Sequence, residues 1–278
     1  MTANPRAFIL SVHYNEDFWV TVQRKYLDLH IDMPHQRLFA AHGVDRTLFR
    51  SEDVLFDHAG DHATGLNMLS AEALKLAANN DWLIFLDSDA VPIRPISSVL
   101  REDQPFIAVQ RLDNLGDIQP HPSFCAVKAG LWRDISPDWS AGYTWVNSAG
   151  ATVTDVGAGV LKVLEETGTQ WTPLIRRNRA NYHFLRWGVY GRKSEPPVIY
   201  HHGAGSRGPS SRVNRMRKKD PEWRKKLRTL RFVAWVLLFS RRGDLGVSVS
   251  GVLTRRSTFS QGLERAIARN PDFWRAFY

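Results

Sequence analysis

The sequence contains a single cysteine, Cys125, and no apolar run long enough to cross a bilayer. One cysteine excludes an intrachain disulfide and a metal centre built from several cysteines. The longest uninterrupted apolar run, residues 232–239, is far shorter than the roughly 20 residues that a membrane helix needs. The opening MTANPRAFIL lacks the charged start, apolar stretch and small-residue cleavage site of a secretory signal. We therefore expect a cytoplasmic location.

The net positive charge of the chain is concentrated in one stretch. Between Arg212 and Arg242, twelve Lys or Arg residues accompany two acids, while the whole chain of 278 residues has a net charge of +9. The positive charge is therefore confined to residues 212–242, here called the basic segment. This confinement argues against nucleic-acid binding by the chain as a whole. With 43% hydrophobic residues the chain can form a large core, which excludes disorder throughout.

The apolar pattern predicts an α/β fold with a mostly parallel sheet flanked by helices. Nearly continuous apolar strands that alternate with helices are typical of a sheet covered on both faces. The expected strands lie at 6–12, 36–42, 82–86, 105–110, 123–132 and 196–207, and the expected helices at 17–29, 65–78 and 155–168. Ligands of such sheets bind beyond the carboxyl ends of the strands. His13 to Glu16, Asp45 and Asp87 to Asp89 are all predicted at that edge.

Two carboxylates end the strand at 82–86. Asp87 and Asp89 stand at positions i and i+2, where both can point toward one cation. A few hard oxygen ligands, with room for water and phosphate oxygens, describe a Mg²⁺ or Mn²⁺ site. The triplet alone also fits a pair of solvated turn residues. Its position after a buried strand favours the metal site.

Three segments together resemble family 2 glycosyltransferases. SVHYNEDF resembles the TYNE segment after that family's first strand, and ATGLNMLSAEALKLAANNDWLIFLDSDAVP is similar to its helix and metal-binding strand. VIYHHGAGSR resembles the family's late histidine and Gly-rich turn. The resemblance covers residues 6–207 in the right order. It implies a GT-A fold, with a catalytic domain at 1–208 and a basic helical region at 209–278.

The resemblance also implies site roles. A Mn²⁺ or Mg²⁺ ion would be held by Asp87, Asp89 and His201, with His202 as the competing ligand, because neighbouring strand residues face opposite sides. The sugar donor would carry a nucleotide, most commonly UDP. The residues implied to line it are Tyr14, Asn15, Glu16, Asp45, Gly65, Asn67, Asp87 and Arg207. Arg207 fits a plain surface residue equally well.

A transferase that inverts the sugar's configuration needs a carboxylate to take the proton of the acceptor hydroxyl. Asp155 stands about where that residue lies in relatives, although an Asp before a helix can equally be its N-cap. Asp138 is a second, weaker candidate. The expected activity is transfer of a sugar to a glycan or lipid-linked acceptor, in cell-surface polysaccharide synthesis. The alternatives are an Asp-x-Asp phosphohydrolase and a membrane-bound scaffold that keeps a nucleotide pocket.

The basic segment resembles a surface-binding helix. Pro221 is suited to start a helix, and Trp223, Leu227 and Leu230 begin an apolar stripe opposite Lys and Arg. Such a helix suits an anionic membrane surface, in whose plane it lies. The alternatives are a basic helix packed on the catalytic domain and, third, a nucleic-acid role. We therefore predict peripheral association with the inner face of a membrane.

Overall fold

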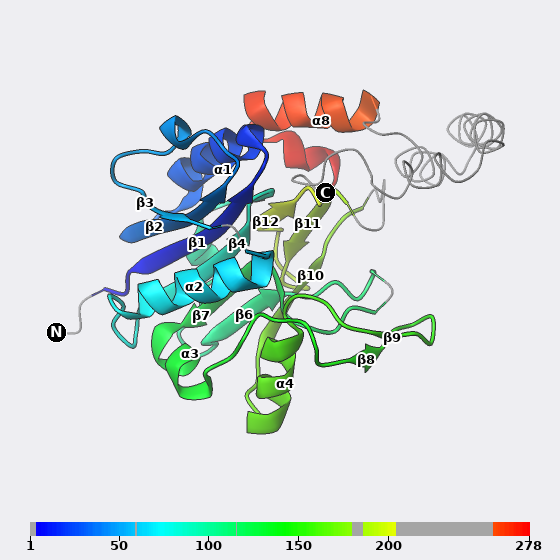
Figure 1. Cartoon of the computed structure of the whole chain (residues 1–278). Helices are drawn as coiled ribbons and strands as arrows, with labels where there is room; N and C mark the ends of the chain where they lie inside the picture. The colour runs from blue at the N-terminus through cyan, green and yellow to red at the C-terminus, as the bar shows by residue number, and fades with distance from the viewer. Residues whose placement is uncertain (1–3, 59, 115, 180–185, 204–257) are drawn as a thin grey trace, which may run out of the picture.

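The computed structural model describes residues 4–58, 60–114, 116–179, 186–203 and 258–278. A 10-stranded sheet runs in the order β3-β2-β1-β4-β7-β6-β10-β11-β12-β5, and β8 pairs with β9 in a separate ribbon (Figure 1). The strands are β1 Ala7–Tyr14, β2 His35–His42, β3 Val54–Asp57, β4 Trp82–Asp87, β5 Ala90–Pro92, β6 Phe106–Val109, β7 His121–Lys128, β8 Trp145–Val146, β9 Thr152–Val153, β10 Thr172–Arg176, β11 Gly188–Gly191 and β12 Ile199–His201. The helices are α1 Asp17–His30, α2 His62–Leu74, α3 Ala129–Ile135, α4 Ala158–Thr167 and α8 Thr258–Arg269, with short 3-10 turns η1 Arg46–Leu48, η2 Ile96–Ser98 and η3 Phe273–Ala276.

The predicted α/β fold is confirmed. Strands β3, β2, β1 and β4 are parallel neighbours, and β6 is parallel to β10. The remaining strands of the large sheet pair antiparallel, starting with β7 between β4 and β6. The parallel part therefore comes mainly from the first third of the chain, where strands and helices alternate.

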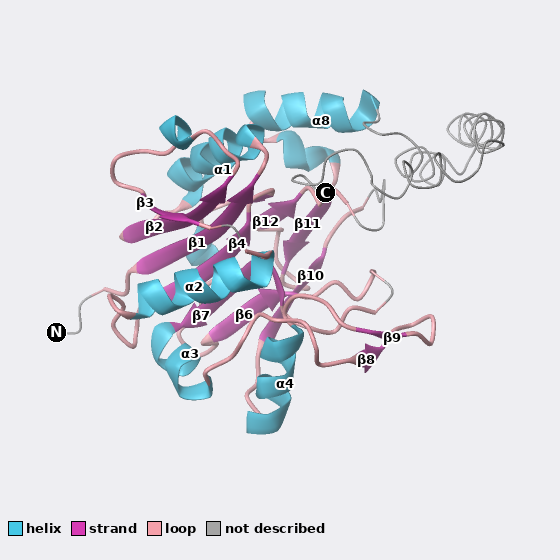
Figure 2. Ribbon diagram, viewed as in Figure 1, coloured by secondary structure: helices cyan, strands magenta, loops and turns pink. Residues whose placement is uncertain are grey.

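Both faces of the sheet are covered, which explains why its strands are apolar without interruption. Alternate side chains of a strand point to opposite faces. On β1, Phe8 and Leu10 join the core under α2, while Ala7 and Ile9 join the core on the opposite face. Figure 2 shows α2, α3 and α4 on the near side of the sheet and α1 and α8 above it.

One predicted strand is partly helical. Residues 123–132 were expected to continue as a strand, but β7 ends at Lys128 and α3 begins at Ala129. At this boundary the Lys128 side chain donates to the carbonyl oxygen of Asn80, 2.9 Å away in the loop before β4. The apolar run continues through this boundary because Trp132 remains in the core from its position on the helix.

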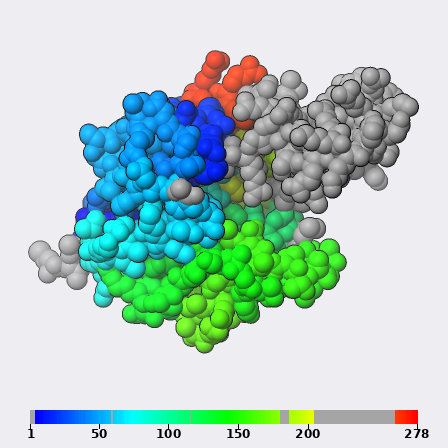
Figure 3. Space-filling model, viewed as in Figure 1, coloured from blue at the N-terminus to red at the C-terminus, as the bar shows by residue number. Residues whose placement is uncertain are grey.

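The end of the chain returns to the core. Residues 258–278 fall in the region that the sequence assigns to a basic C-terminal part, yet Leu263, Ile267 and Phe277 are buried against α1, β11 and β12. The Tyr26 hydroxyl donates to the carbonyl oxygen of Ile267 at 2.8 Å. Figure 3 shows the red atoms of the last residues, at the top of the view, beside blue atoms from the first part of the chain. None of the helices in the described part of the chain has the length and apolar character to cross a membrane.

Candidate metal and donor site

The Asp87–Asp89 turn lies where β4 leaves the sheet. Asp87 pairs in register with Val12 of β1, so its side chain lies near the carboxyl ends of the parallel strands. Gln23, fully buried on α1, donates its side-chain amide to the carbonyl oxygens of Asp87, at 2.7 Å, and Ala90, at 3.0 Å. This one side chain therefore fixes the backbone on both sides of the two carboxylates.

His201 reaches the same turn from the other end of the chain. Strand β12 pairs antiparallel with β5, and the register places His201 opposite Ala90, the residue after Asp89. Its Nε2 atom lies 3.3 Å from Oδ1 of Asp89 and 3.5 Å from Oδ2 of Asp87. Asp89 and His201 are both buried, and Asp87 is partly buried.

These three side chains form a donor set suited to a divalent cation. One ligand atom from each of Asp87, Asp89 and His201 lies within 4.8 Å of the others, and among the described residues this is the one such group. Two carboxylate oxygens with one imidazole nitrogen suit Mn²⁺, and carboxylates also suit Mg²⁺. The residues therefore fit the metal that the sequence predicts.

His202 faces the opposite side of its strand, as the alternation of strand residues requires. Its Nδ1 atom is 3.0 Å from the Tyr200 hydroxyl, and its ring centroid is 4.8 Å from that of Trp19. Burial lowers the pKa of His202 to about 3, against the opposite effect of Asp89. His202 is therefore a neutral residue of the aromatic core between α1 and β12, and the structure places His201 with the two aspartates.

We expect His201→Ala and His202→Ala to differ in kind. His201→Ala removes a nitrogen from the donor set and should weaken Mn²⁺ binding by more than the roughly 10–100-fold typical of residues that only support a ligand. His202→Ala should leave Mn²⁺ affinity near the wild-type value and lower the melting temperature, because a buried Tyr200 hydroxyl without its partner costs about 1–3 kcal/mol. Electron paramagnetic resonance of Mn²⁺, with melting curves of both variants, measures this. The reverse order of Mn²⁺ affinities would assign the ligand to His202.

Two further histidines adjoin Asp87 and were not anticipated from the sequence. His62, the first residue of α2, places Nε2 2.9 Å from Oδ1 of Asp87. His121, at the start of β7, has Nδ1 4.0 Å from Oδ2 of Asp87 and accepts the Ser123 backbone N–H there at 3.0 Å. Burial, helped by the charge of Arg111, holds the pKa of His121 well below its usual range, so that ring is neutral.

The pKa of His62 is shifted in the opposite direction to that of His121. Burial alone would lower the pKa of His62, but its hydrogen bond to Asp87 and the charges of Asp87 and Asp89 outweigh that effect and raise it. No sequence pattern indicates either contact, since both depend on how α2 and β7 sit beside β4. The feature of the sequence that could have pointed to His62 is its position directly after Asp61, the N-cap of α2.

The predicted base-binding residues lie together at the ends of β1 and β2. Tyr14 is 43% exposed and stacks on His42, with ring centroids 4.9 Å apart and planes 15° apart. Asn15 adopts a left-handed conformation at φ 53°, and its N–H donates to the carbonyl oxygen of His42. Glu16 is the N-cap of α1. Asp45 accepts hydrogen bonds from the backbone N–H and hydroxyl of Thr47, and so caps η1.

Gly65 and Asn67, two residues on α2 that were predicted to line the nucleotide-sugar, make contacts within the protein. A Cβ at Gly65 would lie 2.8 Å from Cγ2 of Val12, so this glycine allows α2 to approach β1 closely. Asn67 donates to Asp138 and accepts the backbone N–H of Trp139 at 3.0 Å. Asp138 also accepts from Ser140, and these hydrogen bonds outweigh burial and lower its pKa. Asp138, the weaker base candidate, therefore shapes a loop.

Asp155 lies before α4 but does not cap it, because the N-cap residue is Gly157. Its Oδ1 accepts the adjacent Val156 N–H at 2.9 Å, and its Oδ2 is 3.5 Å from Nη2 of Arg111. The side chain is 52% exposed. Both base candidates are exposed, but the carboxylate of Asp138 accepts three hydrogen bonds on one oxygen, whereas each oxygen of Asp155 has one partner. Arg207 lies outside the described residues.

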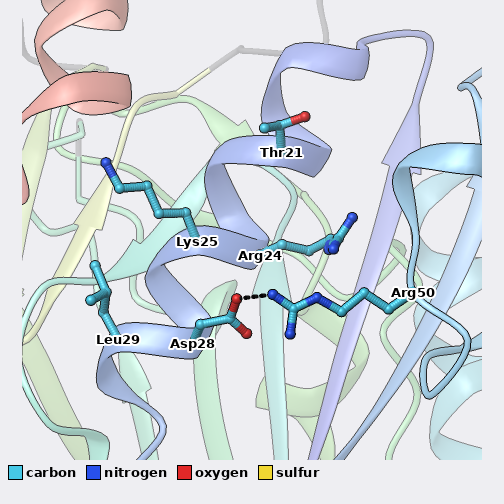
Figure 4. A pocket seen from close by; sticks show the side chains of 6 residues that line it. All are labelled: Thr21, Arg24, Lys25, Asp28, Leu29 and Arg50. Carbon is cyan, nitrogen blue, oxygen red and sulfur yellow. Dashed lines mark hydrogen bonds and ion pairs between the residues drawn. The ribbon is translucent and has the colours of Figure 1, made fainter.

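A surface hollow on α1 has no part in this cluster (Figure 4). Its lining residues are Thr21, Arg24, Lys25, Asp28, Leu29 and Arg50, and none of them contributes to the donor set. Asp28 accepts from Arg50, as the dashed line shows, and also from Arg37 at 2.6 Å. Its carboxylate is therefore already satisfied within the protein.

No family model and no curated protein matches the chain. Several solved structures do. The chain is similar to mannosyltransferase PcManGT from Pyrobaculum calidifontis in complex with GDP-Man and Mn²⁺, at 14% identity and a TM-score of 0.36 over 50% of this chain and 48% of that one. It is also similar to the apo form of the glycosyltransferase GlyE of Streptococcus pneumoniae TIGR4, at 11% identity and a TM-score of 0.38 over 62% of this chain and 45% of that one.

A third similar structure is the galactosyltransferase LgtC in complex with donor and acceptor sugar analogs, at 13% identity and a TM-score of 0.31 over 46% of this chain and 59% of that one. The chain thus spans about half the length of the solved structures it matches. All three are glycosyltransferases, the class that the sequence motifs resemble.

Proposed function

We propose that this chain is a metal-dependent glycosyltransferase that moves a sugar from a nucleotide-sugar donor to a glycan or lipid-linked acceptor. The observation that supports it most is the convergence of Asp87, Asp89 and His201. His201 stands more than a hundred positions after the two aspartates in the sequence, yet the ligand atoms of all three lie within 4.8 Å of one another beside the ends of the parallel strands. Ligands of α/β sheets bind at that edge.

The donor set fits the chemistry of a departing diphosphate. A Mn²⁺ or Mg²⁺ ion held by Asp87, Asp89 and His201 would neutralise the negative charge that develops on the leaving nucleoside diphosphate. The chain's own contribution is to hold the two carboxylates in place, which Gln23 does through the backbone on either side of them. Because this backbone is fixed by a buried side chain, the ligands need little rearrangement to bind.

The nucleotide is assigned to the adjoining edge of the sheet. Tyr14, supported from below by His42, offers an exposed aromatic face on which a base can stack. Asn15 and Glu16 follow it, and both lie one strand away from Asp87. This arrangement supports a donor that extends from the ends of β1 and β2 toward β4. We propose UDP as the nucleotide, because it is the commonest one in the family that the sequence motifs resemble.

Asp155 is the proposed general base. Its exposed carboxylate can accept the proton of an acceptor hydroxyl as that oxygen attacks the sugar's anomeric carbon, while the bond to the diphosphate breaks. Arg111, near Oδ2, orients the carboxylate. The acceptor is proposed to be lipid-linked because the basic segment has the composition of a membrane-surface helix.

The test is calorimetric titration of the full chain with UDP and with GDP, each with and without Mn²⁺. We expect one of the two nucleotides to bind in the presence of Mn²⁺ and to bind much more weakly without it. In a separate assay, the corresponding nucleotide-sugar should be hydrolysed slowly when Mn²⁺ is present. A phosphohydrolase would instead release phosphate from simple phosphate esters. A scaffold would bind nucleotide and leave the sugar attached. Absence of metal-dependent nucleotide binding would overturn the proposal.

A further inference from the structure

His62 makes a direct contact with one oxygen of the proposed metal ligand Asp87. Its Nε2 atom lies 2.9 Å from Oδ1 of Asp87, which is a good hydrogen-bond distance. An ionised carboxylate can only accept, so the imidazole N–H is the donor. The His62 side chain is 33% exposed and that of Asp87 is 16% exposed, so the bond is partly shielded from water.

The position of His62 is fixed by the start of its helix. Asp61 is the N-cap of α2, and its side chain accepts the Thr64 backbone N–H at 2.8 Å and the Thr64 hydroxyl at 2.8 Å. A capped first turn has a defined backbone, so the first helical residue cannot swing freely. His62 therefore approaches Asp87 from a rigid element.

The two oxygens of Asp87 have different surroundings. Oδ1 faces His62, whereas Oδ2 lies 3.5 Å from Nε2 of His201 and 4.0 Å from Nδ1 of His121. A carboxylate bound by one hydrogen-bond donor cannot rotate without breaking that bond. Oδ2 is therefore held on the side of Asp89 and His201, where the donor set converges.

We propose that His62 is a positioning residue for Asp87, whose Oδ1 it holds by a hydrogen bond so that Oδ2 is presented to the metal. This inference rests on the proposed metal-dependent function. His62 lies outside the group of mutually close ligand atoms, so it acts through Asp87 and does not coordinate. Supporting residues of this kind orient a ligand and also raise its affinity for the metal.

The test compares two variants of similar volume in the full chain, with Mn²⁺ alone as the probe. His62→Gln keeps an N–H donor near Nε2, and His62→Leu removes it. Electron paramagnetic resonance of free and bound Mn²⁺ should show binding weakened about 10–100-fold in His62→Leu and largely restored in His62→Gln. His62→Ala serves as a second variant without a donor, and melting curves verify that each variant is folded.

The control is His35→Ala, at the other end of the sheet, where β2 begins; it should bind Mn²⁺ like the wild type. Equal Mn²⁺ affinity of His62→Leu and His62→Gln, while Asp89→Asn loses the ion, would overturn the role of His62 and leave the metal site standing. A wild-type chain that binds no Mn²⁺ would overturn the proposed function and this inference with it.

Discussion

Replacement of Asp89 by Asn is expected to reduce sugar transfer by about 100-fold or more, the scale on which loss of one preorganised charge-stabilising group lowers turnover. Asn has nearly the volume of Asp, so the change creates no cavity at this buried position. What it removes is one of two negative charges that lie beside the His201 imidazole. The variant should therefore keep the fold and lose the affinity for the ion.

Thermal unfolding with and without Mn²⁺ separates these two effects. A ligand that binds only the folded state stabilises it by about 2.7 kcal/mol when present at 100 times its dissociation constant. Mn²⁺ should therefore raise the melting temperature of the wild type and leave that of Asp89→Asn unchanged. Asp103→Asn, at a surface position away from the cluster, is the matched control and should behave as the wild type. A tenfold loss of turnover corresponds to about 1.4 kcal/mol of lost transition-state stabilisation. If Asp89→Asn kept more than about a tenth of the wild-type turnover, the metal assignment would be contradicted.

The parallel part of the sheet and its carboxylate pair could be predicted from the sequence because both depend on local pattern. β1 and β4 are buried on both faces, so each reads as a mainly apolar run, and Asp87 is visible as the polar residue that ends β4. The boundary between β7 and α3 was not predictable in this way. Residues on both sides of Lys128 are apolar and buried, and a short apolar run does not distinguish a strand from a helix.

The residues around the carboxylates could be predicted only where a motif names them. His201 is found by its place before a Gly-rich turn, whereas His62, His121 and Gln23 meet Asp87 through the packing of α2, β7 and α1. The spacing of residues in the sequence does not predict contacts that depend on how separate elements pack. Asn67 shows the opposite case, since its motif suggests a ligand contact and its side chain is bound to the loop around Asp138.

The last residues of the chain change how the basic segment can be tested. Truncation after Gly208 would remove Leu263, Ile267 and Phe277, together with Phe273 and Trp274, from the core they share with α1 and β12. Loss of one buried Phe side chain costs about 3–5 kcal/mol, and a domain is stable by only about 5–15 kcal/mol. Such a truncation should unfold the protein, so the segment has to be altered within the full chain.

Neutralising the basic segment is expected to release the protein from anionic vesicles. Changing its twelve Lys and Arg residues to Gln lowers the net charge of the chain from +9 to −3 and keeps residues 258–278 in place. Each basic residue near an anionic surface contributes up to about 1 kcal/mol, and salt screens the attraction within about 8 Å at physiological ionic strength. Wild-type binding to phosphatidylserine vesicles should therefore weaken as salt rises, and the neutral variant should bind weakly at all salt concentrations.

A second variant tests the apolar half of the proposal. Changing Trp223, Leu227 and Trp235 to Ala keeps every charge, so vesicle binding at low salt should remain. The vesicle binding that persists at high salt should be lost, because it depends on insertion of apolar side chains, which salt does not screen. Gln at the exposed Lys75, Lys162 and Arg275, outside the segment, is the control and should pellet like the wild type. Hydrolysis of a soluble donor should be unchanged in all three variants, since none alters the donor set. Equal pelleting of the wild type and the neutral variant would contradict membrane association, and a lowered melting temperature of the neutral variant would favour a helix packed on the catalytic domain.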